Sequence, residues 1–174
     1  MNRPLLDPLV ALGRRFVLPL MEAPARPAEE SKVSTRIGFR LGSSTLLALP
    51  GTLAEIMDPP PVYRLPNTPD WCLGMINLRG NLLPVFNAHA LLDETATRQP
   101  RLLILGSGTE AAGLMVDGLP FNVQLPAQGA TTGRPPLHDL LEPHLGEFWR
   151  HEGELLISFD HRSFLRQLAR MMEN

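Results

Sequence analysis

The sequence is short of cysteine, aromatic residues, net charge and long apolar runs, and each shortage excludes a class of protein. Its one cysteine, Cys72, has no partner for an internal disulfide or a CxxC site. No apolar run approaches the roughly 18–20 residues that a membrane-spanning helix needs. The net charge of −2 argues against bulk binding of nucleic acid, which requires surplus cations. We therefore expect a soluble intracellular protein that inserts into no membrane.

Motifs of the common enzyme classes are missing as well. The five histidines form no HxH, HxxxH or HExxH pattern, so no local zinc motif is present. Residues 106–111 fit the loose GxGxxA nucleotide pattern, but Gly118 and Pro120 end any following helix too early to hold a phosphate. A hairpin turn is the preferred interpretation there, and Cys72 is interpreted as a small buried hydrophobe. No catalytic residue, metal or cofactor is expected.

The chain divides into three parts by composition. Residues 1–21 are predicted to form an amphipathic helix, because Leu5, Leu9, Leu12, Phe16 and Leu20 recur at three- and four-residue intervals. Residues 22–34 are charged, contain two prolines and have almost no bulky apolar side chains, which predicts a linker. The globular domain is predicted to occupy residues 35–174.

Short apolar runs punctuated by proline and glycine, about ten residues apart, indicate that this domain is mainly β. The predicted strands cover residues 36–41, 45–49, 73–78, 82–86, 102–105, 112–116 and 155–159. Turns are expected at residues 42–44 and 106–110, and a proline-rich surface loop at residues 59–69.

Three short helices are expected between and after these strands, at residues 88–92, at residues 138–145 and at the C-terminus. The last is the clearest, because Asp160 can cap it and a core-facing stripe follows, made of Phe164, Leu165, Leu168, Met171 and Met172. Its opposite face carries Arg162, Arg166 and Arg170 at four-residue spacing. These arginines form either a basic ridge for an acidic partner or an ordinary solvated face near a helix C-terminus, where cations suit the dipole. The second interpretation is favoured.

Residues 69–87 predict a hairpin in which two apolar strands flank the turn Arg79-Gly80-Asn81. A hairpin alone does not explain an arginine at the tip, where a planar guanidinium can pair with a carboxylate in a fixed geometry. The stretch GMINLRG at residues 74–80, followed by Leu83-Pro84-Val85, resembles the hallmark of CheW-like domains, the coupling modules of bacterial chemosensory arrays. Residues 37–42, 47–56 and 113–117 also resemble family elements, so the resemblance covers roughly residues 35–170.

Within the family, the strand IGFR at residues 37–40, the predicted N-terminal helix before a linker and the stretch FWRH at residues 148–151 resemble the PilI type, which belongs to the system that controls type IV pilus twitching. The resemblance implies two SH3-like, five-stranded β-barrel subdomains around a shared core, with short helices and a C-terminal helix. It also implies a non-catalytic cytoplasmic adaptor, associated with membrane-anchored receptor arrays. Such an adaptor joins the cytoplasmic tips of methyl-accepting chemoreceptors to the regulatory domain of a CheA-type histidine kinase. The family has an aspartate where this chain has Asn87, which can still cap the following helix.

The resemblance places a receptor-binding groove beside the hairpin. It implies an ion pair between Arg79 and Glu55 at the groove edge, with Ile76 and Leu78 lining the groove and Asn77 and Gly80 in the motif that binds the receptor. Since receptor tips are helical hairpins, the expected mode is helix-in-groove. One alternative, within the same fold, is a stand-alone regulator that uses this surface for another partner. The other is a ligand-binding or enzymatic β-barrel with an unrecognised site. The enzymatic alternative requires a cavity lined by convergent titratable groups, whereas an adaptor requires an exposed apolar groove.

Overall fold

The computed structural model describes residues 33–96, 99–126 and 136–172. The predicted helix at residues 1–21 lies outside these residues, as does the predicted linker up to residue 32. Strand β1 begins at Val33, so the last two residues of the range predicted as linker are strand instead. They belong to the sheet because Val33 and Ser34 pair with Pro126 and Leu125 of the neighbouring strand.

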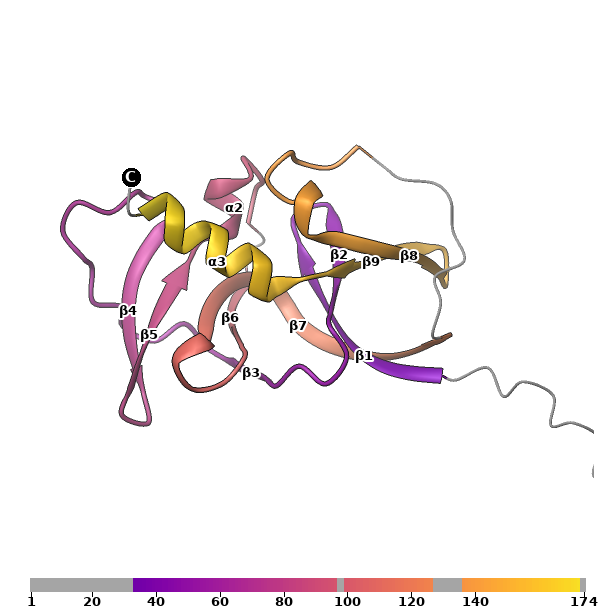
Figure 1. Cartoon of the computed structure of the whole chain (residues 1–174), viewed down its shortest axis with the longest axis horizontal. Helices are drawn as coiled ribbons and strands as arrows, with labels where there is room; N and C mark the ends of the chain where they lie inside the picture. Colours follow the sequence, from indigo (N-terminus) through magenta and orange to yellow (C-terminus); the bar gives the residue numbers. More distant parts are fainter. Residues whose placement is uncertain (1–32, 97–98, 127–135, 173–174) are drawn as a thin grey trace, which may run out of the picture. The chain divides into compact units, whose positions relative to one another are not determined.

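The described residues are mostly strand (Figure 1). The strands are β1 (Val33–Leu41), β2 (Ser44–Ala48), β3 (Ala54–Met57), β4 (Cys72–Leu78), β5 (Asn81–Phe86), β6 (Pro100–Leu105), β7 (Ala112–Pro126), β8 (Leu145–His151) and β9 (Glu154–Phe159). The helices are α2 (Ala88–Leu91), α3 (His161–Met172) and the 3-10 turns η1 (Gly108–Glu110) and η2 (Glu142–His144). None of these helices is long and apolar enough to cross a membrane.

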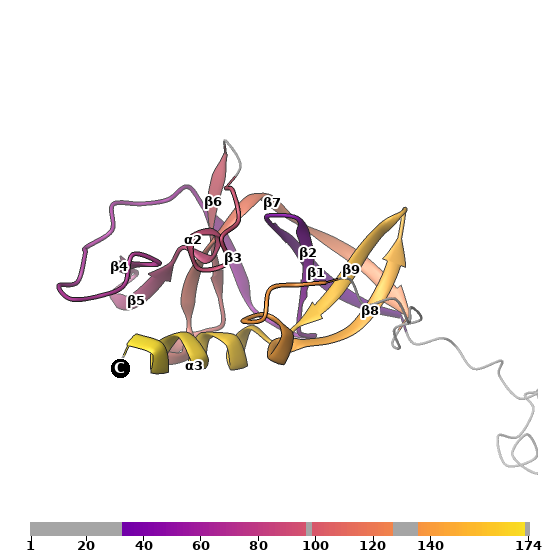
Figure 2. The same ribbon diagram turned by 90° about the horizontal axis from the view of Figure 1, so that it is seen from above.

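The long strand β7 belongs to two five-stranded units. Its first half pairs with β6 on one side and with β5 on the other, and its second half pairs with β1. The first barrel therefore has the strand order β3-β6-β7-β5-β4, and the second has β7-β1-β2-β9-β8. Figure 2 shows the two groups of strands on either side of β7. This arrangement confirms the prediction of a mainly β fold with two five-stranded subdomains.

Apolar side chains fill three cores, which explains why the strands are apolar on both faces. One core lies within the first barrel and consists of Ile76, Leu83, Val85, Leu102, Ile104 and Ala111. Another lies within the second barrel and consists of Leu47, Val123, Leu125, Trp149 and Leu156. A larger core is shared by both barrels. Strand β6 alternates between two of them: Leu102 and Ile104 point into the first barrel, and Leu103 and Leu105 into the shared core.

Helix α3 seals the shared core. The Oδ1 atom of Asp160 accepts a hydrogen bond of 3.0 Å from the backbone N–H of Ser163, which confirms the predicted cap. Phe164 and Leu168 are buried in the shared core. The helix begins where β9 of the second barrel ends and runs along the first barrel (Figure 2).

Three predictions about elements were wrong. The helix expected at residues 138–145 is a turn followed by η2, because Leu145 starts β8 and pairs with Phe159. The short strands β3 and β8 were not predicted. Strand β7 continues well beyond residue 116, because Gly118 adopts a φ of 68° and Pro120 lies in the stretch between two blocks of pairing with β1. No ladder hydrogen bond is needed from this residue, so the missing N–H of a proline costs nothing there.

Candidate functional site

The tip of the β4–β5 hairpin is a two-residue turn made by Arg79 and Gly80. Leu78 pairs with Asn81, and the two turn residues have φ values of 52° and 87°. Two consecutive positive φ values are typical of a type I′ turn, in which Asn-Gly is the favoured sequence. The Oδ1 atom of Asn77 accepts a hydrogen bond of 2.8 Å from the N–H of Gly80 and braces the turn. Turn geometry alone therefore favours asparagine, not arginine, at position 79.

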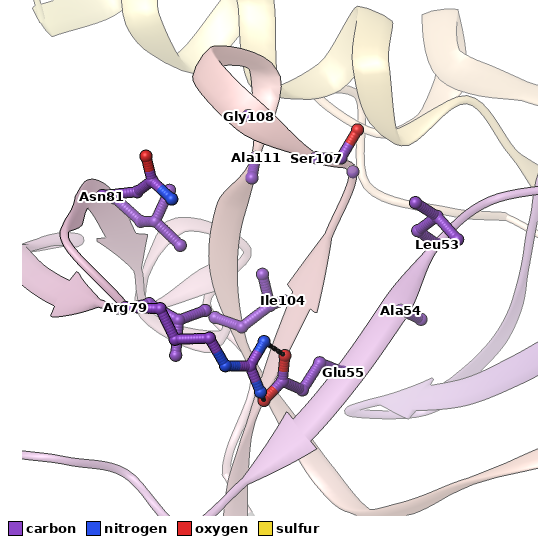
Figure 3. Close-up of a pocket in the computed structure, with 12 residues that line it drawn as sticks. Leu53, Ala54, Glu55, Arg79, Asn81, Ile104, Ser107, Gly108 and Ala111 are labelled. Carbon is purple, nitrogen blue, oxygen red and sulfur yellow. Dashed lines mark hydrogen bonds and ion pairs between the residues drawn. The ribbon is translucent and has the colours of Figure 1, made fainter.

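The guanidinium of Arg79 crosses from this turn to β3, where it forms a two-pronged ion pair with Glu55. The Nη1–Oε2 distance is 2.9 Å and the Nη2–Oε1 distance is 2.7 Å (Figure 3). Both side chains are exposed, so the geometry confirms the predicted ion pair but its contribution to stability is small, about 0–1 kcal/mol. Because a bidentate pair fixes the plane of the guanidinium, its main effect is to orient Arg79.

Glu55 and Arg79 stand at the edge of an open groove of about 290 Å³, which we call the Arg79 groove. One wall comes from β3 and the residues before it, and another from the hairpin tip. Leu83 and Ile104, which are both buried, line its floor. The chain between β6 and β7 forms the remaining wall (Figure 3). Leu53, at the rim, is 65% exposed.

The residues lining the groove are mostly apolar or small, and Glu55 and Arg79 carry the only charges among them. No cluster of three or more potential metal ligands occurs in the described ranges. An apolar floor beside one oriented ion pair suits the docking of a macromolecule. It lacks the convergent titratable groups that the enzyme alternative requires.

Only some of the predicted site residues line the groove. Leu78 lines the groove as expected, while Asn77 and Gly80 shape the turn and do not line it. Ile76 is only 2% exposed, so the prediction that it lines the groove was wrong. It pairs with Leu83 deeper in the hairpin and packs into the first barrel's core.

Sequence reasoning missed Leu53, Ile104 and the wall formed by residues 106–108 and Ala111. Leu53 did carry a signal, because it stands two positions before Glu55 and side chains two apart on extended chain share a face. The wall at residues 106–111 carried none. Its place in the groove depends on the pairing of β3 with β6, which joins segments far apart in the sequence.

The first glycine of the hairpin motif has a separate structural role. Gly74 has a φ of 126°, and a Cβ atom at this position would overlap the carbonyl oxygen of Tyr63. Tyr63 and Met75 exchange two backbone hydrogen bonds of 2.8 and 2.9 Å. Gly74 thus lets the loop between β3 and β4 lie directly on β4, which holds the hairpin beside β3.

A buried polar cluster lies away from the groove. The Nε2 atom of His89 is 2.9 Å from the Oδ2 atom of Asp117, which also accepts a hydrogen bond of 2.7 Å from the N–H of Gly42. These contacts join α2, β7 and the β1–β2 turn, so the cluster fixes the relation of the two barrels. Asn87 caps α2 by accepting a hydrogen bond from the N–H of Ala90, as predicted.

A second buried polar group, Arg36, lies in the second barrel. It donates hydrogen bonds of 2.9 Å to the carbonyl oxygen of Ala48 and to the hydroxyl of Ser158, and it stacks 5.3 Å from the ring centroid of Trp149. Burial lowers the pKa of Arg36, and Glu147 acts in the opposite direction. Because Arg36 is buried and these contacts lie within the barrel, we interpret it as a structural residue.

Comparisons with known proteins agree with this geometry. Residues 36–169 match the model of the CheW-like domain family. The chain is 31% identical to Protein PilI of Pseudomonas aeruginosa over 150 residues, covering 80% of this chain and 84% of that protein. It is 29% identical to the chemotaxis protein CheW of Helicobacter pylori over 100 residues, covering 56% and 61%. The crystal structure of the scaffolding protein TtCheW from Thermoanaerobacter tengcongensis has the same fold, with a TM-score of 0.60 at 16% identity over 75% of this chain and 86% of that one.

Proposed function

The chain belongs to the CheW-like domain family, and from this premise we propose that it couples chemoreceptors to a CheA-type histidine kinase through the Arg79 groove. Membership of this family makes it a non-catalytic scaffold protein. The groove binds the helical hairpin at the cytoplasmic tip of a receptor. Arg79, Glu55 and Leu78 contact this hairpin, while Asn77 and Gly80 hold Arg79 in place.

One observation carries the proposal: the ion pair orients Arg79 across an open apolar groove, although an arginine at this turn position is less favourable than an asparagine. A long side chain with positive φ is disfavoured, and an exposed ion pair returns little stability. Selection for stability alone would place asparagine at position 79. A rigid guanidinium beside an apolar floor is instead what recognition of a helix with apolar and polar positions requires.

The kinase partner is the regulatory domain of a CheA-type kinase, and coupling is by linkage. A receptor state that binds the adaptor–kinase complex more tightly must shift the kinase state by the same free energy, so the adaptor needs no chemistry of its own. The likeness to PilI favours a chemosensory system that controls type IV pili. The adaptor acts in the cytoplasm, at membrane-anchored receptor arrays.

The test is a calorimetric titration of the full chain with a soluble fragment carrying the cytoplasmic tip of a chemoreceptor encoded beside it. Small transient interfaces are weak, so we expect a Kd on the order of micromolar. Arg79→Asn should weaken binding about tenfold or more while keeping the Asn-Gly turn. The matched control is Arg40→Asn, because Arg40 also forms an exposed ion pair, with Glu154, outside the groove.

Each outcome has a clear meaning. Binding that falls with Arg79→Asn and not with Arg40→Asn supports the groove as the receptor site. If neither variant weakens binding, the adaptor role stands but the receptor site lies away from the hairpin. If two folded partners release no heat at high concentration, the coupling role itself is refuted.

A further inference from the structure

The Arg79 groove does not end at the connection between β6 and β7. A small depression of about 130 Å³ shares Leu53, Gly106 and Ser107 with it. The same depression shares Glu110 and Arg162 with a larger hollow of about 510 Å³ beside α3, which we call the α3 hollow. The three form one continuous surface from the hairpin tip to the last helix.

The α3 hollow has an apolar base and a basic rim. Pro84 and Phe86 of β5 line it from the first barrel, and Leu165 and Ala169 line it from α3. Ala169 is exposed and small, so a partner helix can approach the backbone of α3 closely here. Two side chains one turn apart on α3, Arg162 and Arg166, complete the rim, and both are exposed.

Helix stability does not explain these two arginines. Arg162 lies in the first turn of α3, where the helix dipole disfavours a positive charge. Arg166 follows at i+4, the spacing at which like charges repel. The favoured interpretation of the ridge, cations near a helix C-terminus, therefore fits Arg170 in the last turn and fails for Arg162. The alternative interpretation, a basic surface for an acidic partner, remains.

The charged side chains around the hollow indicate which charged residues a partner should carry. Two carboxylates also line it: that of Asp160, which accepts the capping hydrogen bond from Ser163, and that of Glu110 in η1. At the start of α3 the two arginines outnumber Asp160 by one charge, so a helix that enters the hollow gains most when its own carboxylates face Arg162 and Arg166.

We propose that the receptor hairpin docks along this whole surface, with acidic residues of its helices paired to Arg162 and Arg166. This inference rests on the proposed function and extends it: the Arg79 groove fixes one end of the hairpin, and the α3 hollow selects receptors whose tips carry carboxylates at the other. Partner specificity then depends on α3, while the hairpin motif supplies the common contact.

The test compares Arg162→Glu/Arg166→Glu with the control Arg150→Glu/Arg64→Glu, at two exposed arginines, in the same calorimetric titration with the receptor tip. The control makes the same change in net charge at arginines that line neither the groove nor the hollow. We expect the α3 variant to bind about tenfold more weakly at low salt and the control to bind as the wild type does. The difference should shrink at high salt, because exposed charge pairs are screened. Glutamate suits the first turn of α3, so the unfolding temperature of the single variant Arg162→Glu should not fall.

A second arm locates the partner charges. Glutamine substitutions at the acidic residues of the receptor tip should weaken binding to the wild type and add little for the α3 variant, since the two changes remove the same pairs. Binding that falls with Arg79→Asn but ignores the α3 variant overturns this inference and leaves the proposed function standing. Binding that falls with the α3 variant but not with Arg79→Asn overturns the continuous surface and the Arg79 groove as the receptor site, while the adaptor role stands. Equal losses with the α3 variant and the control also overturn the inference, since bulk charge would explain them.

Discussion

Replacing Gly74 with alanine should destabilise the hairpin far more than the same change at Gly80, although both glycines belong to the hairpin motif and both have positive φ. At Gly80 an added Cβ meets no atom within 4 Å, so the cost is backbone strain alone. At Gly74 the Cβ would overlap the carbonyl oxygen of Tyr63, which is backbone and cannot rotate away. The loop carrying Tyr63 must therefore leave β4.

The two costs can be estimated from the structure. Strain at a positive φ is worth about 1 kcal/mol at Gly80, where φ is 87°, and about 1–2 kcal/mol at Gly74, where φ is 126°. Gly74→Ala also breaks the two backbone hydrogen bonds between Tyr63 and Met75, each worth about 1 kcal/mol net. We expect about 3–4 kcal/mol for Gly74→Ala and about 1 kcal/mol for Gly80→Ala.

Urea denaturation followed by circular dichroism measures the difference. With a slope of about 2 kcal/mol per molar urea, the midpoint should fall by about 1.5–2 M for Gly74→Ala and about 0.5 M for Gly80→Ala. The slope of the free energy of unfolding against urea concentration should stay nearly the same in both variants, so that the loss of stability appears as a shift of the midpoint. Equal shifts for the two variants would refute the argument, because they would mean that the loop does not depend on a bare backbone at position 74.

Three further results are expected. Leu53→Ser should weaken receptor binding severalfold without lowering the unfolding temperature, because Leu53 is exposed at the groove rim; Leu119→Ser, at an equally exposed leucine outside the groove, should change neither. Asp117→Ala should cost about 2–4 kcal/mol in a denaturation experiment, since it leaves buried His89 and a backbone N–H without their acceptor. His161→Leu should flatten the pH dependence of the free energy of unfolding between about pH 7 and pH 5. Burial, with a smaller effect of the neighbouring Arg162, lowers the pKa of His161 in the folded protein. As the pH falls below about 6.5, the unfolded chain therefore binds a proton at this histidine before the folded protein does, and stability is lost.

The sequence predicts the strands well where a strand is buried on both faces. The run at residues 102–105 is apolar throughout because β6 contributes alternately to two cores, and its short length between turn signals favours a strand over a helix. Strand β8 lacks this signal, since most of its side chains are exposed or half-buried and its partner β9 supplies the pairing. The prediction ends β7 too early, at residue 116, because a glycine and a proline mark a turn in most contexts. Only the pairing with β1 shows that the chain continues as a strand.

The site could be predicted only as far as the motif reaches. The resemblance to CheW-like domains pointed to both members of the Arg79–Glu55 pair, and they meet because β3 and the hairpin tip border the same groove. Depth within a strand is not visible in a motif, so Ile76 and Leu78 were treated alike although only Leu78 reaches the groove. The hollow beside Arg162 could not be predicted for a similar reason. The sequence places Arg162 on the helix, but the hollow is also lined by residues of β5 that only the fold brings there.

The open edge of the first barrel connects these observations. A closed barrel leaves no strand edge, but among the described residues β3 and β4 end the strand order, and near the hairpin tip a side-chain pair spans them in place of a backbone ladder. A ladder across this gap would have to be broken before a partner could enter. An exposed ion pair costs about 1 kcal/mol or less to rearrange, so a partner helix could enter the groove and exchange contacts with Arg79 without disturbing any of the three cores. If a receptor binds here as proposed, a scaffold with well-packed cores and one weakly closed edge can bind and release it while its fold stays intact.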